Sequence, residues 1–431
     1  MNCANYAMRL LVTAMLLGVA TAQTLPAQSS SEEAVERYTA EIRWLAADER
    51  EGRGIGSNGL TEAGSWIEDR FTEIGLSPAG NAGYRQSFSV SIPDPSDPHA
   101  EGSRIEAFNV VGRLTAGSPD PLPGVVVIGA HFDHLGFGGP GSLDPDSHAI
   151  HNGADDNASG TVALIEVARL LFNRKETLRR DIVFVAFSAE ERGLVGSSAF
   201  VHSPPAGLQV NDITAMLNMD MVGRLEQGRL QVLGGDSAEE WKEVVGPQCE
   251  RLALDCVIQG DGFGSSDHSS FFAAGVPVLH FFTGAHSEYH RPSDDAHLVD
   301  AAGAVRIVQV VAATVGELAD RKTALTLVES TQPAPTRMRT GGARLGTIPD
   351  YAGPADGSPG LLLAAVRSGS PAEQGGLQRG DLIVDIDSFE IRGVEDFMVV
   401  LSEATPGTRA TVRVIRDGQA KELEVTYGGS P

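Results

Sequence analysis

The sequence predicts an α/β protein, in which helices flank a mostly parallel central sheet, followed by a small β-rich domain. Three observations lead to this prediction. Continuous apolar runs, typical of strands that are buried on both faces, recur along the chain at residues 125–130, 181–189, 214–219 and 277–282. Helical segments alternate with these runs between about residues 108 and 320. Beyond residue 343 the apolar runs become short, and turns that contain glycine separate them.

The first element is an expected export signal at residues 1–22. Arg9 precedes an apolar stretch, and Ala20-Thr21-Ala22 supplies the small residues at which such signals are cleaved. The stretch is shorter than the roughly 20 apolar residues that span a bilayer, and we expect no transmembrane segment elsewhere. The protein is therefore expected to be exported, to the periplasm or the extracellular space.

Two cysteines, Cys249 and Cys256, remain once Cys3 is removed with this signal. In an exported protein two such cysteines can form a disulfide. The alternative, a pair of buried thiols, stays open at the level of the sequence.

Length and charge limit the possible functions. The chain has 431 residues, of which 42% are hydrophobic, enough for a large core and for two domains. It carries 33 Lys and Arg against 57 Asp and Glu, a formal net charge of −24, and has no basic cluster. Such a chain is unsuited to the phosphate backbone of nucleic acids, so we expect no nucleic-acid partner.

We divide the chain after the signal into three parts. A large α/β domain covers residues 30–322, a linker without apolar periodicity covers 323–340, and the β-rich domain covers 341–428. Two amphipathic helices within residues 33–78 flank the glycine-rich break EGRGIGSNG, and we interpret them as a packing pair.

Residues that bind metals or transfer protons follow each apolar run: His131 and Asp133, Glu190 and Glu191, Asp220, and His290. A further pair, Asp155 and Asp156, lies in the turn GADDNASG before a helix. Taken singly, each has an ordinary alternative, such as a strand-end histidine, a solvated turn or a helix cap. Ligands gather at the carboxyl ends of parallel strands, so their repetition there indicates one site.

Imidazole nitrogens and carboxylate oxygens are ligands that zinc prefers. Two zinc ions about 3.5–4 Å apart need a bridging carboxylate and terminal ligands for each ion, and the candidates suffice: His131, one Asp of the 155–156 pair, Glu191, Asp220 and His290. Asp133 is placed to orient His131 through its second ring nitrogen. The neighbours Glu190 and Glu191 diverge, so one can bind metal while the other faces substrate as a general base.

Six ordered motifs resemble those of the zinc exopeptidase family of bacterial leucine aminopeptidases, glutamate carboxypeptidase II and glutaminyl cyclase. They are GAHFDHLG (129–136), HNGADDNASG (151–160), FSAEERGLVGS (187–197), LNMDMVG (217–223), SSDHSSFFAAGVP (265–277) and EYHRPSDD (288–295). With a similar opening segment, DEREGRGIGSNGLTEAGSWIEDRFTEIGLSP, the resemblance covers roughly residues 33–320. It implies a mixed eight-stranded sheet covered by helices.

The resemblance implies two Zn²⁺ ions with the following ligands: His131 and Asp220 for one ion, Glu191 and His290 for the other, and Asp156 as the bridge. It makes Glu190 the general base and Asp133 the group that orients His131, and it places a cis peptide bond at the Asp of the GADDN turn. Asp267 and His268 belong to a matching motif and receive only a supporting role. Two residues depart from many relatives, Arg291 in place of Thr and His151 in place of Tyr, and we expect both near the substrate cleft.

The expected function is that of an exported dizinc metallo-aminopeptidase that removes N-terminal residues from peptides. The alternatives on the same scaffold are a carboxypeptidase and a glutaminyl cyclase, although cyclases of this family use a single zinc. A third alternative, from another class, is a peptide-binding adaptor whose peptidase domain is inactive.

The segment SGSPAEQGGLQRGDLIVDID (368–387) resembles the central signature of a PDZ domain. Gly376 and Gly380 allow tight turns, and Ala372, Leu377 and Ile383 are expected core residues. The resemblance places a loop that binds a peptide C-terminus at Leu345, Gly346, Thr347 and Ile348. The alternative is a structural module packed on the enzyme.

Overall fold

The computed structural model describes residues 26–92, 103–139, 141–144, 147–205, 207–225, 228–328, 343–349, 354, 358–366, 369–393, 396–397, 400–401 and 404–428. The predicted export signal at residues 1–22 and residues 329–340 of the predicted linker lie outside these ranges.

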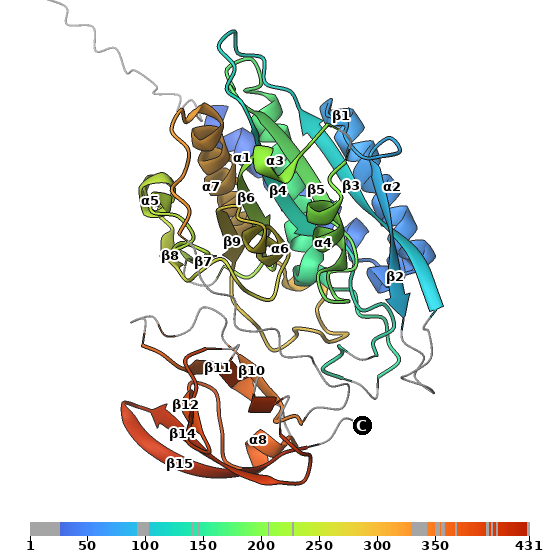
Figure 1. The fold of residues 1–431 in the computed structure, drawn as a ribbon. Coiled ribbons are helices and arrows are strands. Elements are labelled where there is room, and N and C mark those ends of the chain that lie inside the picture. Colours follow the sequence, from blue (N-terminus) through green and yellow to red (C-terminus); the bar gives the residue numbers. More distant parts are fainter. Residues whose placement is uncertain are drawn as a thin grey trace, which may run out of the picture.

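A nine-stranded sheet in the order β1-β3-β5-β4-β6-β9-β7-β8, with β2 paired to β3, forms the centre of the first domain (Figure 1). The strands are β1 (Ser77–Pro78), β2 (Arg85–Ile92), β3 (Ser103–Leu114), β4 (Val125–His131), β5 (Asp181–Phe187), β6 (Ile213–Met219), β7 (Arg229–Leu233), β8 (Asp255–Gln259) and β9 (Val278–Phe282). The resemblance implied eight strands, so that number is wrong. One strand, β1, has only two residues and leaves no periodic signal in the sequence.

The pairing of the strands confirms the predicted fold class. Strands β5, β4, β6 and β9 run parallel to one another in the middle of the sheet. Antiparallel pairs lie toward the edges, where β1, β2 and β5 pair with β3 and where β7 pairs with β9. The sheet is therefore mixed, with a parallel centre.

Both faces of the central strands are buried, which explains their continuous apolar sequences. In β4, Val126, Ile128 and Ala130 pack into one core, and Val125 and Val127 face another on the opposite side. The first core contains residues of α1 (Pro26–Leu45), α2 (Asn58–Ile74), α3 (Gly160–Phe172), α5 (Trp241–Arg251) and α7 (Ala301–Asp320), and the second those of α4 (Val195–His202) and α6 (His268–Ala273). Short helical turns lie at Asp48–Arg53, Ala154–Ser159, Val210–Asp212 and Ala296–Leu298.

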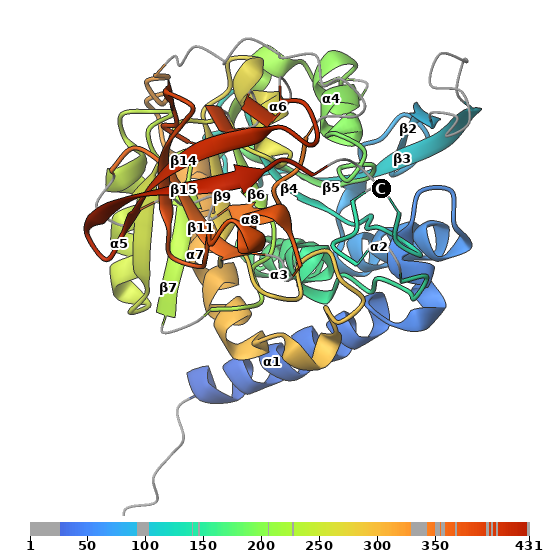
Figure 2. The same cartoon turned by 90° about the horizontal axis from the view of Figure 1, so that it is seen from below.

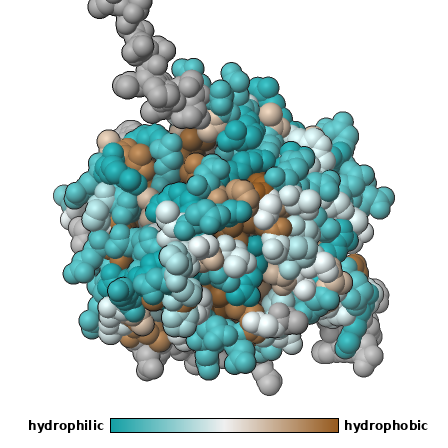
Figure 3. All heavy atoms as spheres, turned by 90° about the horizontal axis from the view of Figure 1, so that it is seen from above, coloured by the Kyte–Doolittle hydropathy of each residue, from teal (hydrophilic) through white to brown (hydrophobic). Residues whose placement is uncertain are grey.

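Helix α7 is the one helix among the described residues that is long and apolar enough to cross a membrane. However, 72% of its apolar window is buried inside the domain. Its composition is therefore explained by packing against α1, α3 and α5. The face of the molecule seen from above in Figure 3 is mainly hydrophilic with small apolar areas.

The second domain is a six-stranded antiparallel sheet in the order β10-β11-β12-β14-β15, with β13 paired to β12 (Figures 1 and 2). Its elements are β10 (Thr347–Pro349), β11 (Leu361–Val366), α8 (Pro371–Gln374), β12 (Leu382–Ile386), β13 (Phe389–Glu390), β14 (Arg409–Arg416) and β15 (Gln419–Thr426). The predicted core residues Ala372, Leu377 and Ile383 are buried in a core of its own. Gly376 and Gly380 have φ values of 84° and 85°, in the left-handed region that favours glycine.

Cys249 and Cys256 form a disulfide, so the paired alternative is the one observed. The bond joins the end of α5 to β8, with the two Cα atoms 6.1 Å apart. Cys249 is buried in the first core.

Residues 323–328, the first part of the predicted linker, lie against the first domain. Leu327 pairs with Ala238 in an isolated β-bridge, and the Val328 N–H donates to the Ser237 carbonyl at 2.9 Å. The chain therefore leaves the first domain later than residue 322.

The glycine-rich break after α1 carries a buried arginine. Arg53 is 0% exposed, and burial lowers the pKa of its guanidinium to about 10, so the group remains a cation at neutral pH. It donates to four backbone carbonyls at 2.7–3.0 Å, those of Leu45, Phe132, Asn152 and Gly153. One side chain thus joins the end of α1 to two loops that carry candidate site residues. The break does more than connect the two helices that we interpreted as a packing pair.

Replacing Arg53 by Met should strongly destabilise the first domain, because four buried carbonyls would lose their donor. Breaking a buried charged network typically costs about 3–5 kcal/mol. Urea unfolding followed by tryptophan fluorescence reports on this domain alone, since the three tryptophans are Trp44, Trp66 and Trp241. Arg43→Met, at an exposed position near the end of α1, is the matched control and should stay within about 0.5 kcal/mol of the unaltered protein. Equal midpoints for both variants would contradict this role for Arg53.

Candidate active site

The candidate residues converge at the carboxyl ends of the central strands. Strand β4 ends at His131 and lies between β5 and β6 in the sheet. Glu190 and Glu191 follow β5, and Asp220 follows β6 directly. Three neighbouring strand ends therefore deliver these side chains to one edge of the sheet. Asp156, from the turn before α3, and His290, from the loop after β9, complete the set.

Asp156 lies between two groups of donor atoms. Its Oδ1 is 3.4 Å from His131 Nε2, which is itself 3.4 Å from Asp220 Oδ1. Its Oδ2 is 3.2 Å from His290 Nε2, which is 3.2 Å from Glu191 Oε2. Each half of one carboxylate thus faces a different histidine.

These spacings fit metal ligands. Zinc binds nitrogen and oxygen at about 2.0–2.1 Å, so neighbouring ligand atoms of a tetrahedral site stand about 3.3 Å apart. The four distances of 3.2–3.4 Å match that edge. The donor set is also of the kind that zinc accepts, and His131, Asp156 and Asp220 form one compact group able to hold an ion. On the second side, the compact group contains Asp156, Glu191 and a residue that the sequence analysis missed, His134.

Backbone carbonyls fix the orientation of both ligand histidines. His131 Nδ1 is 3.2 Å from the Asp133 carbonyl oxygen, and His290 Nδ1 is 2.8 Å from that of Gly141. In the neutral rings Nδ1–H donates to these carbonyls and the Nε2 lone pair is left for a metal.

Asp133 differs from the expectation in one respect. Its carboxylate Oδ1 is 3.7 Å from His131 Nδ1, farther than its own backbone oxygen, and it accepts the Glu190 N–H at 3.1 Å. The backbone of Asp133 orients the ring, while its side chain anchors the loop that carries the glutamate pair.

Buried hydrogen bonds hold the Asp156 loop. Asp294 Oδ2 accepts the backbone N–H groups of Asp155 and Asp156 at 2.9 and 3.1 Å. Asp155 points elsewhere, since its Oδ1 accepts the Gly223 N–H at 2.6 Å. Asp156 is therefore the member of the pair that faces the site, and the peptide bond between Asp156 and Asn157 is cis, as the resemblance implied.

The two neighbouring glutamates differ in the pKa of their side chains. Burial and the nearby Glu191 and Asp267 raise the pKa of Glu190 well above its usual value, although His131 opposes this. Burial also raises the pKa of Glu191, but His290 and His134 lower it by more and hold the pKa of Glu191 at about 2. Glu191 is thus a permanent anion beside the histidines, whereas Glu190 has the affinity for a proton that a base requires.

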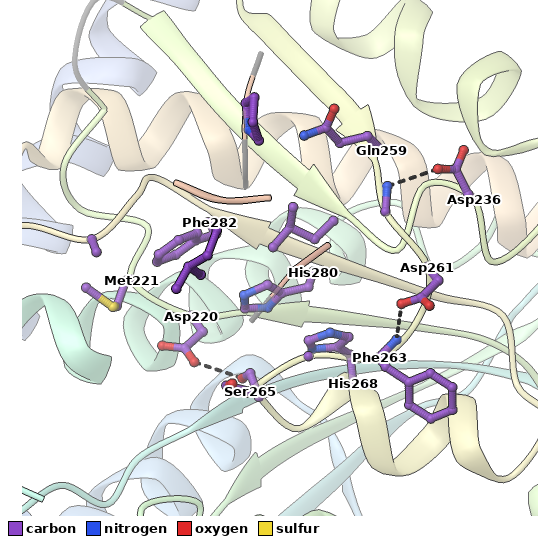
Figure 4. A pocket seen from close by; sticks show the side chains of 18 of the residues that line it. Asp220, Met221, Asp236, Gln259, Asp261, Phe263, Ser265, His268, His280 and Phe282 are labelled. Atoms are coloured by element: carbon purple, nitrogen blue, oxygen red, sulfur yellow. Dashed lines mark hydrogen bonds between the residues drawn. The ribbon is translucent and has the colours of Figure 1, made fainter. Parts of the chain in front are cut away.

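A cavity of about 520 Å³ opens onto this centre (Figure 4). His131, Asp156, Glu190, Asp220 and His290 line it, whereas Glu191 does not, so the two neighbouring glutamates face different surroundings. Segments of the second domain contribute to its wall: residues 358–361, Arg392 and Gly393.

Several side chains of the supporting motif also lie at this cavity. His268 lines it together with His280, on which it stacks with ring centroids 4.5 Å apart. Burial lowers the pKa of each to about 3, so both rings are neutral. Arg291 and His151 are not among the lining residues themselves, although Arg291 directly follows His290, which lines the cavity. His151 is buried and bonds to Ser142 through Nε2 at 2.8 Å.

His134, Arg53 and Asp294 are three buried polar residues near the site to which the sequence analysis gave no role, and Ser266 and His280 are two more. His134 lies in the same motif as His131 and Asp133, which was the available signal. The signal for Asp294 was its place in EYHRPSDD. For Arg53 the only signal in the sequence was its position in a glycine-rich break.

The predicted peptide-binding residues lie together in the second domain, away from the metal ligands in sequence. Leu345 is buried in the core of this domain, and Gly346 has a φ of 78°. Thr347 and Ile348 begin β10, which ends the sheet order and pairs only with β11 among the described strands.

Comparisons with known proteins agree with this geometry. Residues 109–315 match peptidase family M28, and residues 337–427 match the PDZ domain family. Aminopeptidase YwaD of Bacillus subtilis is 32% identical over 183 residues, which are 40% of this chain and 36% of that protein. Leucine aminopeptidase 1 of Sclerotinia sclerotiorum is 33% identical over 180 residues, 38% of this chain and 43% of that protein. The chain thus spans less than half the length of these curated relatives.

Solved structures show the same fold. A zinc aminopeptidase from Bacillus subtilis, BSAP, has a TM-score of 0.52 at 18% identity, covering 68% of this chain and 95% of its own. A glutaminyl cyclase from Bacteroides thetaiotaomicron has a TM-score of 0.53 at 16% identity, covering 65% of this chain and 97% of its own. At these identities the likeness concerns the fold alone. By the sequence matches, residues 109–315 belong to peptidase family M28, and a PDZ domain follows them in the same chain.

Proposed function

We propose that this chain is an exported metallo-aminopeptidase with two zinc ions, which hydrolyses N-terminal residues from peptides. The observation that carries the proposal is the position of Asp156 between the two donor groups, with Glu190 facing the same cavity. His131 and Asp220 would hold one ion, Glu191 and His290 the other, and Asp156 would contribute to both.

Zinc bound there would lower the pKa of a water molecule and polarise the scissile carbonyl. Glu190 would take a proton from that water and pass it to the leaving amine. Burial and neighbouring carboxylates raise its pKa, which makes it a stronger base than an exposed glutamate. Ser266 donates to Asp220 Oδ2 at 2.8 Å and thereby leaves Oδ1 toward His131.

The charge of the cavity favours the amino end of a peptide. Five carboxylates line it: Asp156, Glu190, Asp220, Asp236 and Asp261. Arg392 is the one Lys or Arg among the lining residues. Zinc ions would neutralise Asp156 and Asp220, so the carboxylates left to attract a substrate ammonium group are Glu190, Asp236 and Asp261. Their excess over the single arginine supports an aminopeptidase over a carboxypeptidase. A glutaminyl cyclase remains the second candidate because proteins of that name share the fold.

For the second domain we propose binding of a peptide C-terminus at Leu345–Ile348. Among the described strands β10 pairs only with β11, so its other edge could pair with an added strand, and backbone N–H groups near Gly346 could hold the carboxylate. Export is supported by the pattern of residues 1–22 and by the Cys249–Cys256 disulfide, since such bonds persist in oxidising compartments.

A substrate panel tests the activity. Zinc-loaded protein should release the arylamine from aminoacyl-anilides, and removal of metal by a chelator should abolish the release until zinc is restored. Cleavage of N-blocked peptides at their C-terminus would indicate a carboxypeptidase instead. Ammonia release from peptides with N-terminal glutamine would indicate a cyclase. No turnover of any substrate would favour an adaptor.

Glu190→Gln should leave zinc content unchanged and lower kcat by roughly 10²–10⁴-fold, because the amide cannot accept the proton of the water. Zinc content by mass spectrometry and steady-state rates on an aminoacyl-anilide measure the two effects. Glu191→Gln is the contrasting variant, since it should lower zinc content as well. A Glu190→Gln protein with near-normal kcat would refute the assignment.

Gly346→Asp should abolish binding of peptides through their C-terminal carboxylate, because it adds a like charge and a side chain at a φ of 78°. Gly418→Asp is a matched control in the β14–β15 turn, with the same added charge, a φ of 73° and open space around it. Fluorescence anisotropy of a labelled peptide compares the two. Binding that survives Gly346→Asp would place the peptide site elsewhere.

A further inference from the structure

His134 is a buried histidine that the proposed mechanism does not use. Its side chain is inaccessible to solvent, and its backbone N–H donates to the Arg53 carbonyl at 3.2 Å. The ring lies directly against Gly153, where an added Cβ would stand 2.5 Å from Cγ and Cδ2 of His134. The position of this ring is therefore defined by its surroundings.

The ring contacts the second group of donors through one nitrogen. His134 Nδ1 is 2.7 Å from Glu191 Oε1 and 3.8 Å from Asp156 Oδ2. The other carboxylate oxygen of Glu191, Oε2, is the one that faces His290 Nε2 at 3.2 Å. Nε2 of His134 is buried and has no hydrogen-bond partner among the described residues.

Two roles are compatible with membership of this cluster, that of a metal ligand and that of a hydrogen-bond donor to a ligand. The distances distinguish between these two roles. A contact of 2.7 Å is a hydrogen bond and is shorter than the ligand–ligand spacing of about 3.3 Å in a tetrahedral zinc site. The contact also uses Oε1, whereas the spacings of Oε2 match a shared ion.

We propose that His134 is a positioning residue for the second metal position, the one between His290 and Glu191. Its Nδ1–H holds Oε1, so that Glu191 presents only Oε2 to the ion. This inference rests on the proposed two-ion centre and deepens it. Donors of this kind beside a metal ligand typically account for about 10–100-fold in metal affinity.

The experiment compares His134→Leu with His134→Asn in the full chain. Leucine fills the space without a donor, whereas the Asn side-chain amide can place an N–H near the position of Nδ1. Stepwise competition with a chelator measures the affinity of each zinc. We expect His134→Leu to weaken one of the two zinc ions by roughly 10–100-fold and leave the other unchanged, with most of the loss restored in His134→Asn. His202→Leu, at an exposed position on α4, should behave as the unaltered protein.

Each other outcome overturns the inference. Unchanged affinity in His134→Leu, or an equal loss for both ions, would show that His134 does not position Glu191. A loss in His134→Asn as large as that in His134→Leu would have the same meaning. If the unaltered protein binds only one zinc, the proposed two-ion centre fails and this inference fails with it, and the stoichiometry of the unaltered protein is therefore measured first.

A second measurement does not depend on the folding of any variant. Nitrogen-15 spectra of the histidine rings in the zinc-loaded, unaltered protein distinguish a protonated nitrogen from a metal-bound one. His134 should appear with a proton on Nδ1 and no coordinated nitrogen, while His131 and His290 each show coordination at Nε2. A coordinated nitrogen in His134 would make it a ligand and overturn the proposal.

Discussion

The structure depends on how it accommodates a group of buried carboxyl groups at the carboxyl ends of β4, β5 and β6. Six of them surround the site: Asp133, Asp156, Glu190, Glu191, Asp220 and Asp267. Buried anions are costly unless cations or protons accompany them. The protein uses several routes at once, with imidazoles next to Asp156, the Arg53 cation nearby, and raised pKa values at Asp133 and Asp267, which burial brings to about 6 and about 7. Divalent cations between the donor groups would compensate this charge most directly.

The same constraint explains why the loops around the site are bound so tightly. The ligand side chains hold donor atoms about 3.3 Å from one another, and this spacing tolerates little displacement. The backbone that carries them must therefore be rigid. Arg53 binds the carbonyls of Phe132, next to His131, and of Gly153, in the turn before Asp156. Asp294 fixes the turn that carries Asp156, and Asp133 fixes the backbone of Glu190. None of these three is placed as a ligand. They transmit the rigidity of the sheet to residues that lie just beyond its strands.

Sequence patterns predicted the fold class and the convergence of His131, Glu191 and Asp220 because both follow from local features. Continuous apolar runs mark strands buried on both faces, and a residue at the end of such a run lies at the ligand-binding edge. What was missed depends on contacts between distant residues. Glu191 is 57 positions from His134, and the carbonyls that Arg53 binds lie up to 100 positions away. Strand β1, with two residues, and the packing of residues 323–328 on the first domain likewise leave no periodic pattern.

The arrangement of the cavity bears on the difference between an exopeptidase and an endopeptidase. An enzyme that cuts inside a polypeptide needs a groove open on both sides of the scissile bond, so that the chain can continue in each direction. Here residues 358–361 and Arg392 of the second domain stand in the wall of the cavity that contains Glu190. A wall on one side of the scissile bond would admit a chain end and exclude an interior segment, and the lining carboxylates that are not proposed metal ligands, Glu190, Asp236 and Asp261, would favour an end that carries an ammonium group.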